Sequence, residues 1–532
     1  AEPPRTTPPG LTRISCPLAG SYTTVARAGD NWLERQSLAR LDILKSVQRT
    51  DLRRRPLLAG ALASNHDSIR GERTEAIETY QLTLAALRPR ARTTSTAERV
   101  VLDVLESVAL RSTNATQRAL EPARRARQTL DELGVDERRE LVRELPRLRA
   151  EVAMSFARAG ADEEALATLE DLGGSPAVDP RTLYGLSLRA LVLALRGDLP
   201  EAVRDLEVIE ASPHAEVRAG RDDHLYRIAR AIVCLERFDA RGAQAHLDVL
   251  RPHLATLETR PVVATVQAYV DLVSFEPALG IERLRRYIES ERGRRRISAR
   301  DIDHLDYVSG LLGLARGQVG AVHSWLKVAP ATSSHTWLLR AHAALLTGRW
   351  STARDVLVAH TPPRTAAPRL RAAHAVLLAA ALTHAEEETQ ARDALDKLAG
   401  VAEDRRLRFA LALPARHDLL TLVELAARSK DQTAQRLIGD AEPVPELFAA
   451  TADLPQPLSD REVVVLDTLM RHATAVDISR SLTVSVNTVK SQLRSIYRKL
   501  GVRRREDALA RGIELGLLPA QRPLPASGTD GR

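Results

Sequence analysis

The sequence is poor in cysteine, in aromatic residues and in lysine. Two cysteines, Cys16 and Cys234, in 532 residues are too few for a disulfide scaffold or a Cys-rich zinc module. Aromatic residues make up 3% of the chain, which disfavours β-sandwiches and barrels and leaves leucine and alanine to fill the core. Six of the 77 basic residues are lysine and the rest are arginine. A chain dominated by alanine, leucine, arginine and glutamate favours helices, so we expect an all-α fold.

The motifs of several common enzyme classes are also missing. No lysine follows a glycine, so the Gly-Lys-Ser/Thr of a phosphate-binding loop is absent, and H-E-x-x-H, G-x-S-x-G and G-x-G-x-x-G do not occur. We therefore predict a protein that is not an enzyme and has no cofactor and no metal. The longest apolar run, Ala372–Leu382, is far shorter than the roughly 20 residues of a membrane span, and no signal peptide is visible. These features predict a cytoplasmic protein without a membrane partner.

Positive charge is concentrated near the C-terminus. The net charge is +8, and residues 456–532 hold 13 Lys/Arg against 8 Asp/Glu, a net of +5. About a seventh of the chain therefore carries more than half of the excess, which indicates a small anion-binding module in that segment.

Residues 30–440 show apolar side chains at steps of three and four, interrupted by short Gly/Pro turns, and no alternating strand pattern. This pattern excludes sheet-containing sensor domains. A Gly-x4-Ala motif recurs within it: Gly71–Ala76, Gly160–Ala165, Gly197–Ala202, Gly348–Ala353 and a degenerate Gly317–Val322. The spacings of 37 positions from Gly160 to Gly197 and 31 from Gly317 to Gly348 lie near the ~34 of a tetratricopeptide repeat, which these motifs resemble. We predict an irregular α-solenoid of TPR-like helical hairpins over 30–440, with an unrelated helical bundle as the alternative.

Proline-rich segments flank the predicted domains. Residues 1–29 begin with a Pro/Thr-rich stretch and are predicted to be a disordered tail. Residues 441–457 contain four prolines and are predicted to be a linker, and residues 519–532 a second disordered tail. Between these two segments, residues 458–518 form a dense helical pattern.

Three helix starts are visible in that pattern. Ser459–Glu462 has the S/T-x-x-E form of a capping box and opens the first helix. Thr474–Asp477 opens a short second helix, and Ser485 caps a third helix over Val486–Leu500. Gly501 ends the third helix, and a fourth runs to about Leu515. A short helix, a three-residue turn and a longer helix form the helix-turn-helix arrangement.

The third helix has two different faces. One is apolar, with residues spaced 3, 4, 3 and 4 apart: Val486, Val489, Leu493, Ile496 and Leu500. The other carries Asn487, Lys490, Ser491, Arg494 and Arg498, and the helix has no acidic residue. A surface helix with only cationic and uncharged polar side chains is suited to a polyanion.

The residues Leu458–Glu462, Ser485–Lys490, Ile496 and Lys499–Val502 make this segment similar to the LuxR-type (GerE-like) DNA-binding domain. The resemblance implies double-stranded DNA as a partner and a homodimer on DNA, paired through helix four with Ala508, Leu509 and Ile513 as candidate contacts. It also implies that Lys490, Ser491 and Arg494 face base edges and that Thr488 contacts phosphate. Asn487 and Arg498 are further candidates for DNA contact, with phosphate contact without base readout as the alternative role for each residue.

Three positions depart from the family pattern. Asp460 stands where the family often has proline, a change that is harmless at a helix start. His472 stands where the family has glycine, and it would be strained if that position needs a positive φ. Arg504 replaces the usual Ser/Thr before helix four, which removes a cap and adds charge.

These features predict a sequence-specific transcriptional regulator whose repeat region receives a small-molecule, peptide or protein signal, with RNA polymerase as a further candidate partner. Trp325, Trp337 and Trp350, together with His335, form a candidate effector pocket, although large rings also simply fill gaps between repeat helices. One alternative is an interaction scaffold that the helix-turn-helix only localises. Another is that the chain, which begins without methionine, is the C-terminal part of a larger ATP-dependent regulator.

Overall fold

A computed structural model describes most of the chain and forms two compact units, residues 1–185 and residues 186–532. The described residues are 49–52, 56–68, 72–87, 95–170, 182–212, 223–291, 297–330, 333–402, 405–428, 444–450, 458–472, 474–514 and 517–518. The two predicted tails lie outside them, as do parts of the predicted linker and the Gly71 turn. The described residues are mostly helical and include no strand, which confirms the predicted all-α fold.

The first unit is a series of helices that pack against their neighbours in sequence, α4 on α5, α6 on α7 and α9 on α10. A buried ion pair joins α6 to α9, with Arg111 Nη2 2.7 Å from Glu151 Oε2, and Ser107 donates to Ser155 at 2.7 Å beside it. The helices of this unit are α3 (Arg49–Leu52), α4 (Pro56–Ser68), α5 (Arg73–Leu87), α6 (Thr96–Ser112), α7 (Leu120–Glu132), α8 (Val135–Glu140), α9 (Leu145–Ala159) and α10 (Asp162–Thr168).

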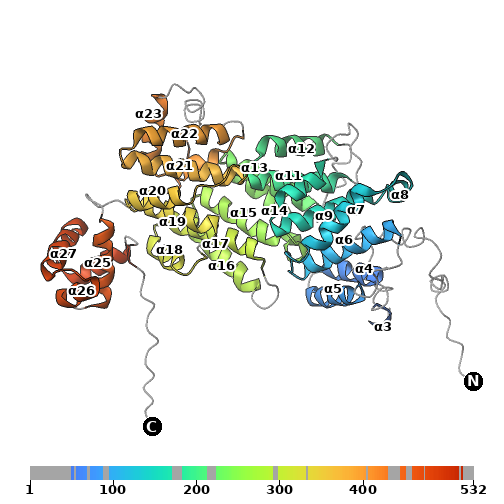
Figure 1. Ribbon diagram of the computed structural model, residues 1–532, viewed down its shortest axis with the longest axis horizontal. Coiled ribbons are helices and arrows are strands. Elements are labelled where there is room, and N and C mark those ends of the chain that lie inside the picture. The colour runs from blue at the N-terminus through green and yellow to red at the C-terminus, as the bar shows by residue number, and fades with distance from the viewer. Residues whose placement is uncertain are drawn as a thin grey trace, which may run out of the picture. The chain divides into compact units, whose positions relative to one another are not determined.

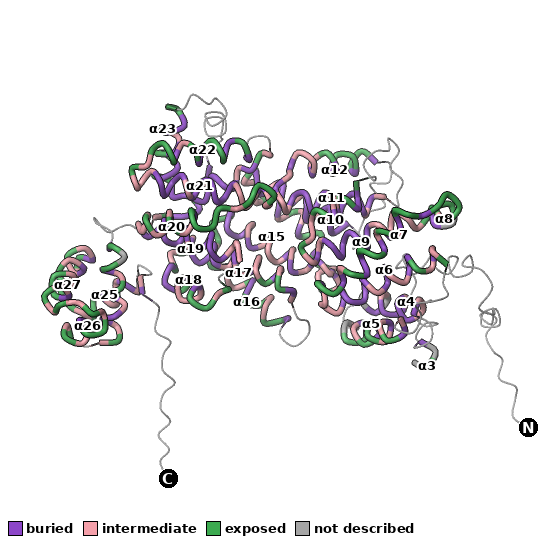
Figure 2. The backbone as a smooth tube through the Cα atoms, viewed as in Figure 1, coloured by how far each residue is buried: buried purple, intermediate pink, exposed green. Residues whose placement is uncertain are grey.

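The second unit continues with helical hairpins, in which α13 pairs with α14, α15 with α16, α19 with α20 and α21 with α22 (Figure 1). Its helices up to the predicted linker are α11 (Leu183–Arg196), which crosses the boundary between the units, α12 (Leu199–Ala211), α13 (His224–Glu236), α14 (Ala240–Leu250), η5 (Arg251–Thr256), α15 (Arg260–Val273), α16 (Pro277–Glu291), α17 (Ala299–Ala315), α18 (Val319–Leu326), α19 (Ser334–Leu346), α20 (Trp350–Ala359), α21 (Pro368–His384), α22 (Glu388–Ala402), η6 (Arg408–Ala412) and α23 (Arg416–Ala427). Helix α21 is buried along most of its length (Figure 2).

The glycine turns predicted from the sequence reverse the chain between paired helices. Gly160, Gly197, Gly317 and Gly348 all have a positive φ, between 70° and 100°, the left-handed conformation that glycine adopts without steric cost. The residue five positions after each of these glycines is buried. Three of these residues are alanines that are 0% exposed: Ala165, Ala202 and Ala353. The predicted helix–Gly–helix unit is therefore confirmed at these positions.

The same turn also occurs with other residues in the glycine position. Phe238, Phe275 and Glu386 have φ values of 58°, 60° and 61° and end α13, α15 and α21. A small buried residue again follows five positions later: Ala243, Gly280 and Ala391. Counting these turns, the left-handed residues from Gly160 to Glu386 are 31 to 42 positions apart.

The buried carboxylate of Glu236 connects the hairpin of α21 and α22 to helices that come much earlier in the chain. Glu236 at the end of α13 is 3% exposed and forms an ion pair with Arg369 in the first turn of α21. Its second oxygen accepts from the backbone N–H of Phe409 at 2.9 Å. Arg369 also donates to the carbonyl of Ala194 at 2.9 Å, at the end of α11. Nearby, a Cβ at Gly197 would lie 2.9 Å from Leu407, so this contact requires glycine for space as well as for its φ of 100°.

Replacing Glu236 with alanine should lower the free energy of unfolding by about 3 kcal/mol, because the Arg369 charge and the Phe409 N–H both lose their buried acceptor. Urea denaturation followed by circular dichroism measures this change. The control is Glu282→Ala, which removes an exposed, solvent-screened ion pair with Arg285 and should leave the free energy of unfolding nearly unchanged. Equal losses in the two variants would contradict the assigned role of Glu236.

Candidate nucleic-acid interface

Four helices at the C-terminal end fold around an apolar core of their own. They are α25 (Asp460–Arg471), α26 (Ala475–Leu482), α27 (Val486–Leu500) and α28 (Arg505–Glu514). All ten buried residues of this core come from this segment: Leu458, Val465, Leu466, Leu469, Ile478, Val489, Ile496, Leu500, Ala508 and Leu518. Val489, Ile496 and Leu500 belong to the apolar stripe predicted for the third helix. The stripe therefore packs inward, as its spacing predicts.

The predicted capping residues fix where these helices begin. The Ser459 and Glu462 side chains form a complete capping box, Thr474 accepts from the Asp477 N–H at 3.2 Å, and Ser485 accepts from the Thr488 N–H at 3.0 Å. At the other end of α27, Gly501 has a φ of 68°, and the Val502 N–H donates to the Tyr497 carbonyl at 3.0 Å. The bounds of α27 are those predicted from the sequence.

One buried carboxylate links the first helix of the domain to the third. Glu462 accepts from its own cap residue and also lies 2.8 Å from Lys499 Nζ on α27. Burial acts to raise the pKa of Glu462, but hydrogen bonds from Lys499, Ser495 and the Ser459 N–H outweigh it, and the pKa is lowered. Glu462 is therefore ionised at neutral pH and holds α27 against α25.

The outer face of α27 is exposed and cationic. Asn487, Lys490, Ser491, Arg494 and Arg498 are all exposed, and Thr488 is half-buried with its hydroxyl 2.8 Å from that of Ser485. Exposed (green) stretches alternate with more buried ones along α27 in Figure 2. Ser491 donates to the Thr488 carbonyl of its own helix at 2.9 Å. Within the described part of the chain, the structure pairs neither Lys490 nor Arg494 with a carboxylate. All six predicted side chains thus lie along one helix, and five of them are open to a ligand.

Besides Arg471 on α25, the domain carries four further exposed arginines outside α27: Arg461, Arg480, Arg503 and Arg504. They were not among the predicted DNA-binding residues, since no spacing in the sequence distinguishes them from other surface arginines. Of the acidic side chains in the domain, Asp467 pairs with Arg471 and Asp477 accepts from the Thr474 hydroxyl at 2.6 Å, while Glu506 and Asp507 are exposed close in sequence to Arg503 and Arg504. The exposed positive charge of Arg461 and Arg480, which lie apart in sequence from Glu506 and Asp507, can add to phosphate contact.

The backbone shows where left-handed strain lies in the domain. His472 has a φ of −124°, an extended conformation, so the strain considered for this position does not arise. Among the described non-glycine residues of the domain, the left-handed one is Thr483 between α26 and α27, with a φ of 53°. A second correction concerns Ala508, a predicted dimer contact: it is 0% exposed, inside the core of the domain. Leu509 and Ile513 are partly buried against the same core.

Residues 456–511 match the family model described as bacterial regulatory proteins, luxR family. The four helices are a LuxR-type helix-turn-helix domain. No curated protein matches the chain with significance. The match covers the segment that contains α25, α26, α27 and most of α28, and it supports a DNA-binding transcription regulator. The tetratricopeptide resemblance of the preceding helices has no such match and stays a prediction.

The predicted effector residues lie on neighbouring helices of the repeats, outside the LuxR-type domain. Trp337 on α19 is 7% exposed and stacks on His360 with ring centroids 5.8 Å apart. Trp350, the first residue of α20, stacks on His384 at 4.1 Å. His335 lies 2.5 Å from a carboxylate oxygen of Asp303, and Trp325 is half-buried on α18. The structure thus places Trp337 and Trp350 in contacts with different histidines, and the effector role of all four residues stays a prediction.

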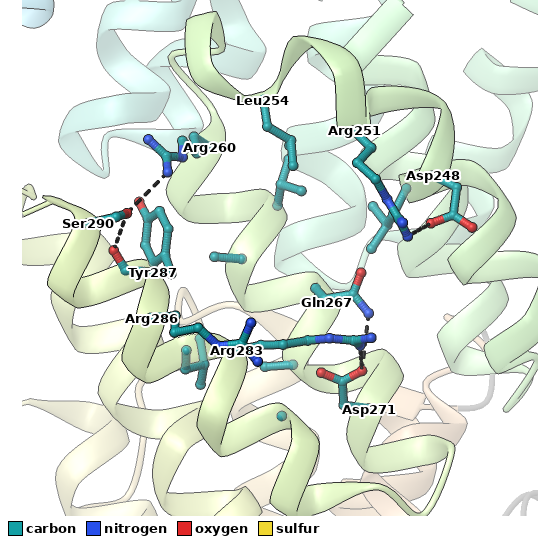
Figure 3. Close-up of a pocket in the computed structure, with 16 residues that line it drawn as sticks. Asp248, Arg251, Leu254, Arg260, Gln267, Asp271, Arg283, Arg286, Tyr287 and Ser290 are labelled. Atoms are coloured by element: carbon teal, nitrogen blue, oxygen red, sulfur yellow. Dashed lines mark hydrogen bonds and ion pairs between the residues drawn. The ribbon is translucent and has the colours of Figure 1, made fainter.

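A cavity of about 340 Å³ lies elsewhere, between α14, η5, α15 and α16 (Figure 3). The residues that line the cavity include the apolar Leu247, Val263 and Leu284. Four arginines also line it: Arg251, Arg260, Arg283 and Arg286. Each arginine has a carboxylate partner, such as Asp248 at 2.6 Å from Arg251 and the buried Asp271 beside Arg283. Of the described residues that line this cavity, none is a predicted effector residue. Sequence spacing gave no signal for this cavity, because its residues come from four elements.

Replacing Thr483 with glycine should raise the stability of the LuxR-type domain by about 1 kcal/mol. The exposed, β-branched Thr483 pays a steric cost in the left-handed region that glycine does not, and this gain exceeds the extra entropy that glycine loses on folding. Thermal unfolding of the domain measures the change. The matched control is Gly501→Ala, at a φ of 68°, which should destabilise by a similar amount. A lower stability for Thr483→Gly would contradict the prediction.

Proposed function

We propose that the chain is a sequence-specific DNA-binding transcriptional regulator that places α27 in the major groove. The observation that carries this proposal is the division of α27 into a buried apolar stripe and an exposed cationic face, inside a domain that matches the LuxR family. Helix α26 and a three-residue turn precede α27, as in helix-turn-helix proteins whose second helix enters the groove.

The length of the exposed face suits a single binding half-site. Asn487 and Arg498 are eleven residues apart, which corresponds to about 16 Å along a helix at 1.5 Å per residue. That distance spans roughly five base pairs of B-DNA at 3.4 Å each. Lys490 and Arg494 lie between these ends and have the donors that pair with guanine O6 and N7, while Asn487 suits adenine and Thr488 suits phosphate.

A half-site of this size favours binding as a homodimer, since two copies read a site twice as long. Because Ala508 is inside the core, the pairing surface on α28 would use the half-buried Leu509 and Ile513 together with the exposed Ala510. The helical repeats would receive the signal, and the cavity between α14 and α16 supports a small-molecule or peptide effector because its volume lies in the range of ligand pockets. RNA polymerase is a further proposed partner, and the location of the protein would be cytoplasmic.

Replacing Arg494 with alanine should relax base preference at one or two positions and cost about 1–3 kcal/mol on the specific site, because a bidentate contact to guanine is lost. Selection of bound sequences from a random DNA pool by the full chain defines the site, and affinity measurements on it give the loss. The control is Arg471→Ala, which removes an exposed cation that pairs with Asp467 on α25. Unchanged base preference in Arg494→Ala would remove this residue from the readout.

Replacing Lys490 with alanine should also weaken binding to the selected site. If the ammonium group contacts phosphate, the slope of log K against log salt should fall by about 0.9, the value for one neutralised phosphate. If it contacts a base, the slope should stay nearer its original value and base preference should change instead. The same DNA at several salt concentrations gives both readings, and unchanged slope, affinity and preference would contradict any role for Lys490.

A further inference from the structure

Three potential metal ligands meet where α21 ends and α23 begins. His384 is the last residue of α21, and His417 and Asp418 lie in the first turn of α23. The ligand atoms of these three residues lie within 4.8 Å of one another. The Nε2 atoms of His384 and His417 lie 2.5 Å and 2.9 Å from the same oxygen, Oδ1 of Asp418. Two imidazoles from different helices therefore direct the same ring nitrogen at one carboxylate oxygen.

The three side chains differ in exposure in a way that suits a binding site with an entrance. The Asp418 side chain is 3% exposed, that of His384 21% and that of His417 57%. The carboxylate forms the base of the cluster and His417 lies at the surface. The indole of Trp350 lies parallel to the His384 ring, with centroids 4.1 Å apart and an interplanar angle of 3°. This contact with α20 fixes the orientation of His384, so the cluster is positioned by three helices.

We propose that His384, His417 and Asp418 bind a divalent transition-metal ion, with Zn²⁺ as the best match. Two imidazole nitrogens and one carboxylate oxygen are a donor set that zinc accepts, and three protein ligands leave a position open for water or a small ligand. In a tetrahedral site, donors about 2.1 Å from the ion lie roughly 3.4 Å apart. The hydrogen-bonded contacts of the cluster would have to open by less than about 1 Å, and the exposed His417 ring has the freedom to do so.

To bind a metal through Nε2, each imidazole must be neutral and carry its one ring proton on Nδ1, so that the Nε2 lone pair faces the ion. The nearby cation is already engaged, because Arg416 donates to the carbonyl of Val444 at 3.2 Å. The three ligands keep a net charge of −1, which favours a divalent cation.

The position of the cluster also indicates what the metal would control, and this step rests on the proposed regulator function. Arg416 adjoins His417 and holds Val444, the first described residue of the predicted linker to the LuxR-type domain. Four residues further on, Phe448 is 0% exposed and packs edge-on against His342 of α19. A shift in the first turn of α23 would therefore act on the segment that leads to the DNA-binding domain. The structure in this way points to a divalent metal as an effector of DNA binding.

Titration of the full chain tests the site. After treatment with a chelator, the wild type should bind one Zn²⁺ in this cluster, measured by calorimetry and by the visible absorption of bound Co²⁺. His417→Gln and Asp418→Asn should weaken this binding by at least about 10- to 100-fold, since losing even an outer-sphere partner of a metal site costs that much. His417→Gln changes an exposed side chain and leaves the fold intact. The control is His360→Gln. His360 is an exposed histidine directly after α20 that does not belong to the cluster, and its Nδ1 atom lies 2.9 Å from the carbonyl of Val356. Equal Zn²⁺ affinity in wild type and His417→Gln, or no binding by the wild type, would overturn the site.

A second measurement tests the regulatory step separately. The affinity of the full chain for its selected DNA site should change by about 5-fold or more on addition of Zn²⁺, in wild type and His360→Gln but not in His417→Gln. If Zn²⁺ binds at the cluster and the DNA affinity stays constant, the metal site stands and its regulatory role is wrong. If the chain selects no DNA at all, the proposed function fails while the metal titration still decides the site.

Discussion

The hydrogen-bonded ion pair between Glu462 and Lys499 is the interaction on which the exposed cationic face of α27, the proposed DNA-binding surface, depends. It connects the start of α25 to the end of α27, and the same carboxylate completes the cap of α25. With one face of α27 fixed by this pair and by Val489, Ile496 and Leu500, the opposite face can present cations without needing partners of its own. The sequence pattern of alternating apolar and basic residues in α27 thus becomes a surface only because the rest of the domain immobilises the helix.

Much of the DNA-binding domain could be predicted from the sequence, because its determinants are local. Caps at Ser459, Thr474 and Ser485 and the glycine at 501 act within a few residues, and the helix faces follow from periodicity. The partner of Glu462 could not be predicted, since Lys499 is 37 residues away and no local rule links the two. The strain at Thr483 was also missed, because a threonine carries no sequence signal for a left-handed conformation.

In the repeat region, too, features that depend on packing between helices could not be predicted from the sequence. Turns with glycine were found, whereas those at Phe238, Phe275 and Glu386 were not, although the small residue five positions later is kept in each. Packing between helices supplies enough free energy to hold an unfavoured φ, so the glycine signature underestimates the number of hairpins. The His384, His417 and Asp418 cluster was likewise outside the reach of spacing arguments, because α22 and η6 separate its members in the chain.

The contact of Arg369 with Glu236 has a consequence for how this protein can evolve. In a simple solenoid each repeat touches only its neighbours, so whole repeats are readily gained or lost. Here the first turn of α21 reaches back to α11 and α13. Insertion or deletion of one hairpin between them would move the Arg369 guanidinium away from the Glu236 carboxylate and leave that buried charge without its partner. The ion pair between Arg369 and Glu236 therefore opposes a change in the number of hairpins between α13 and α21.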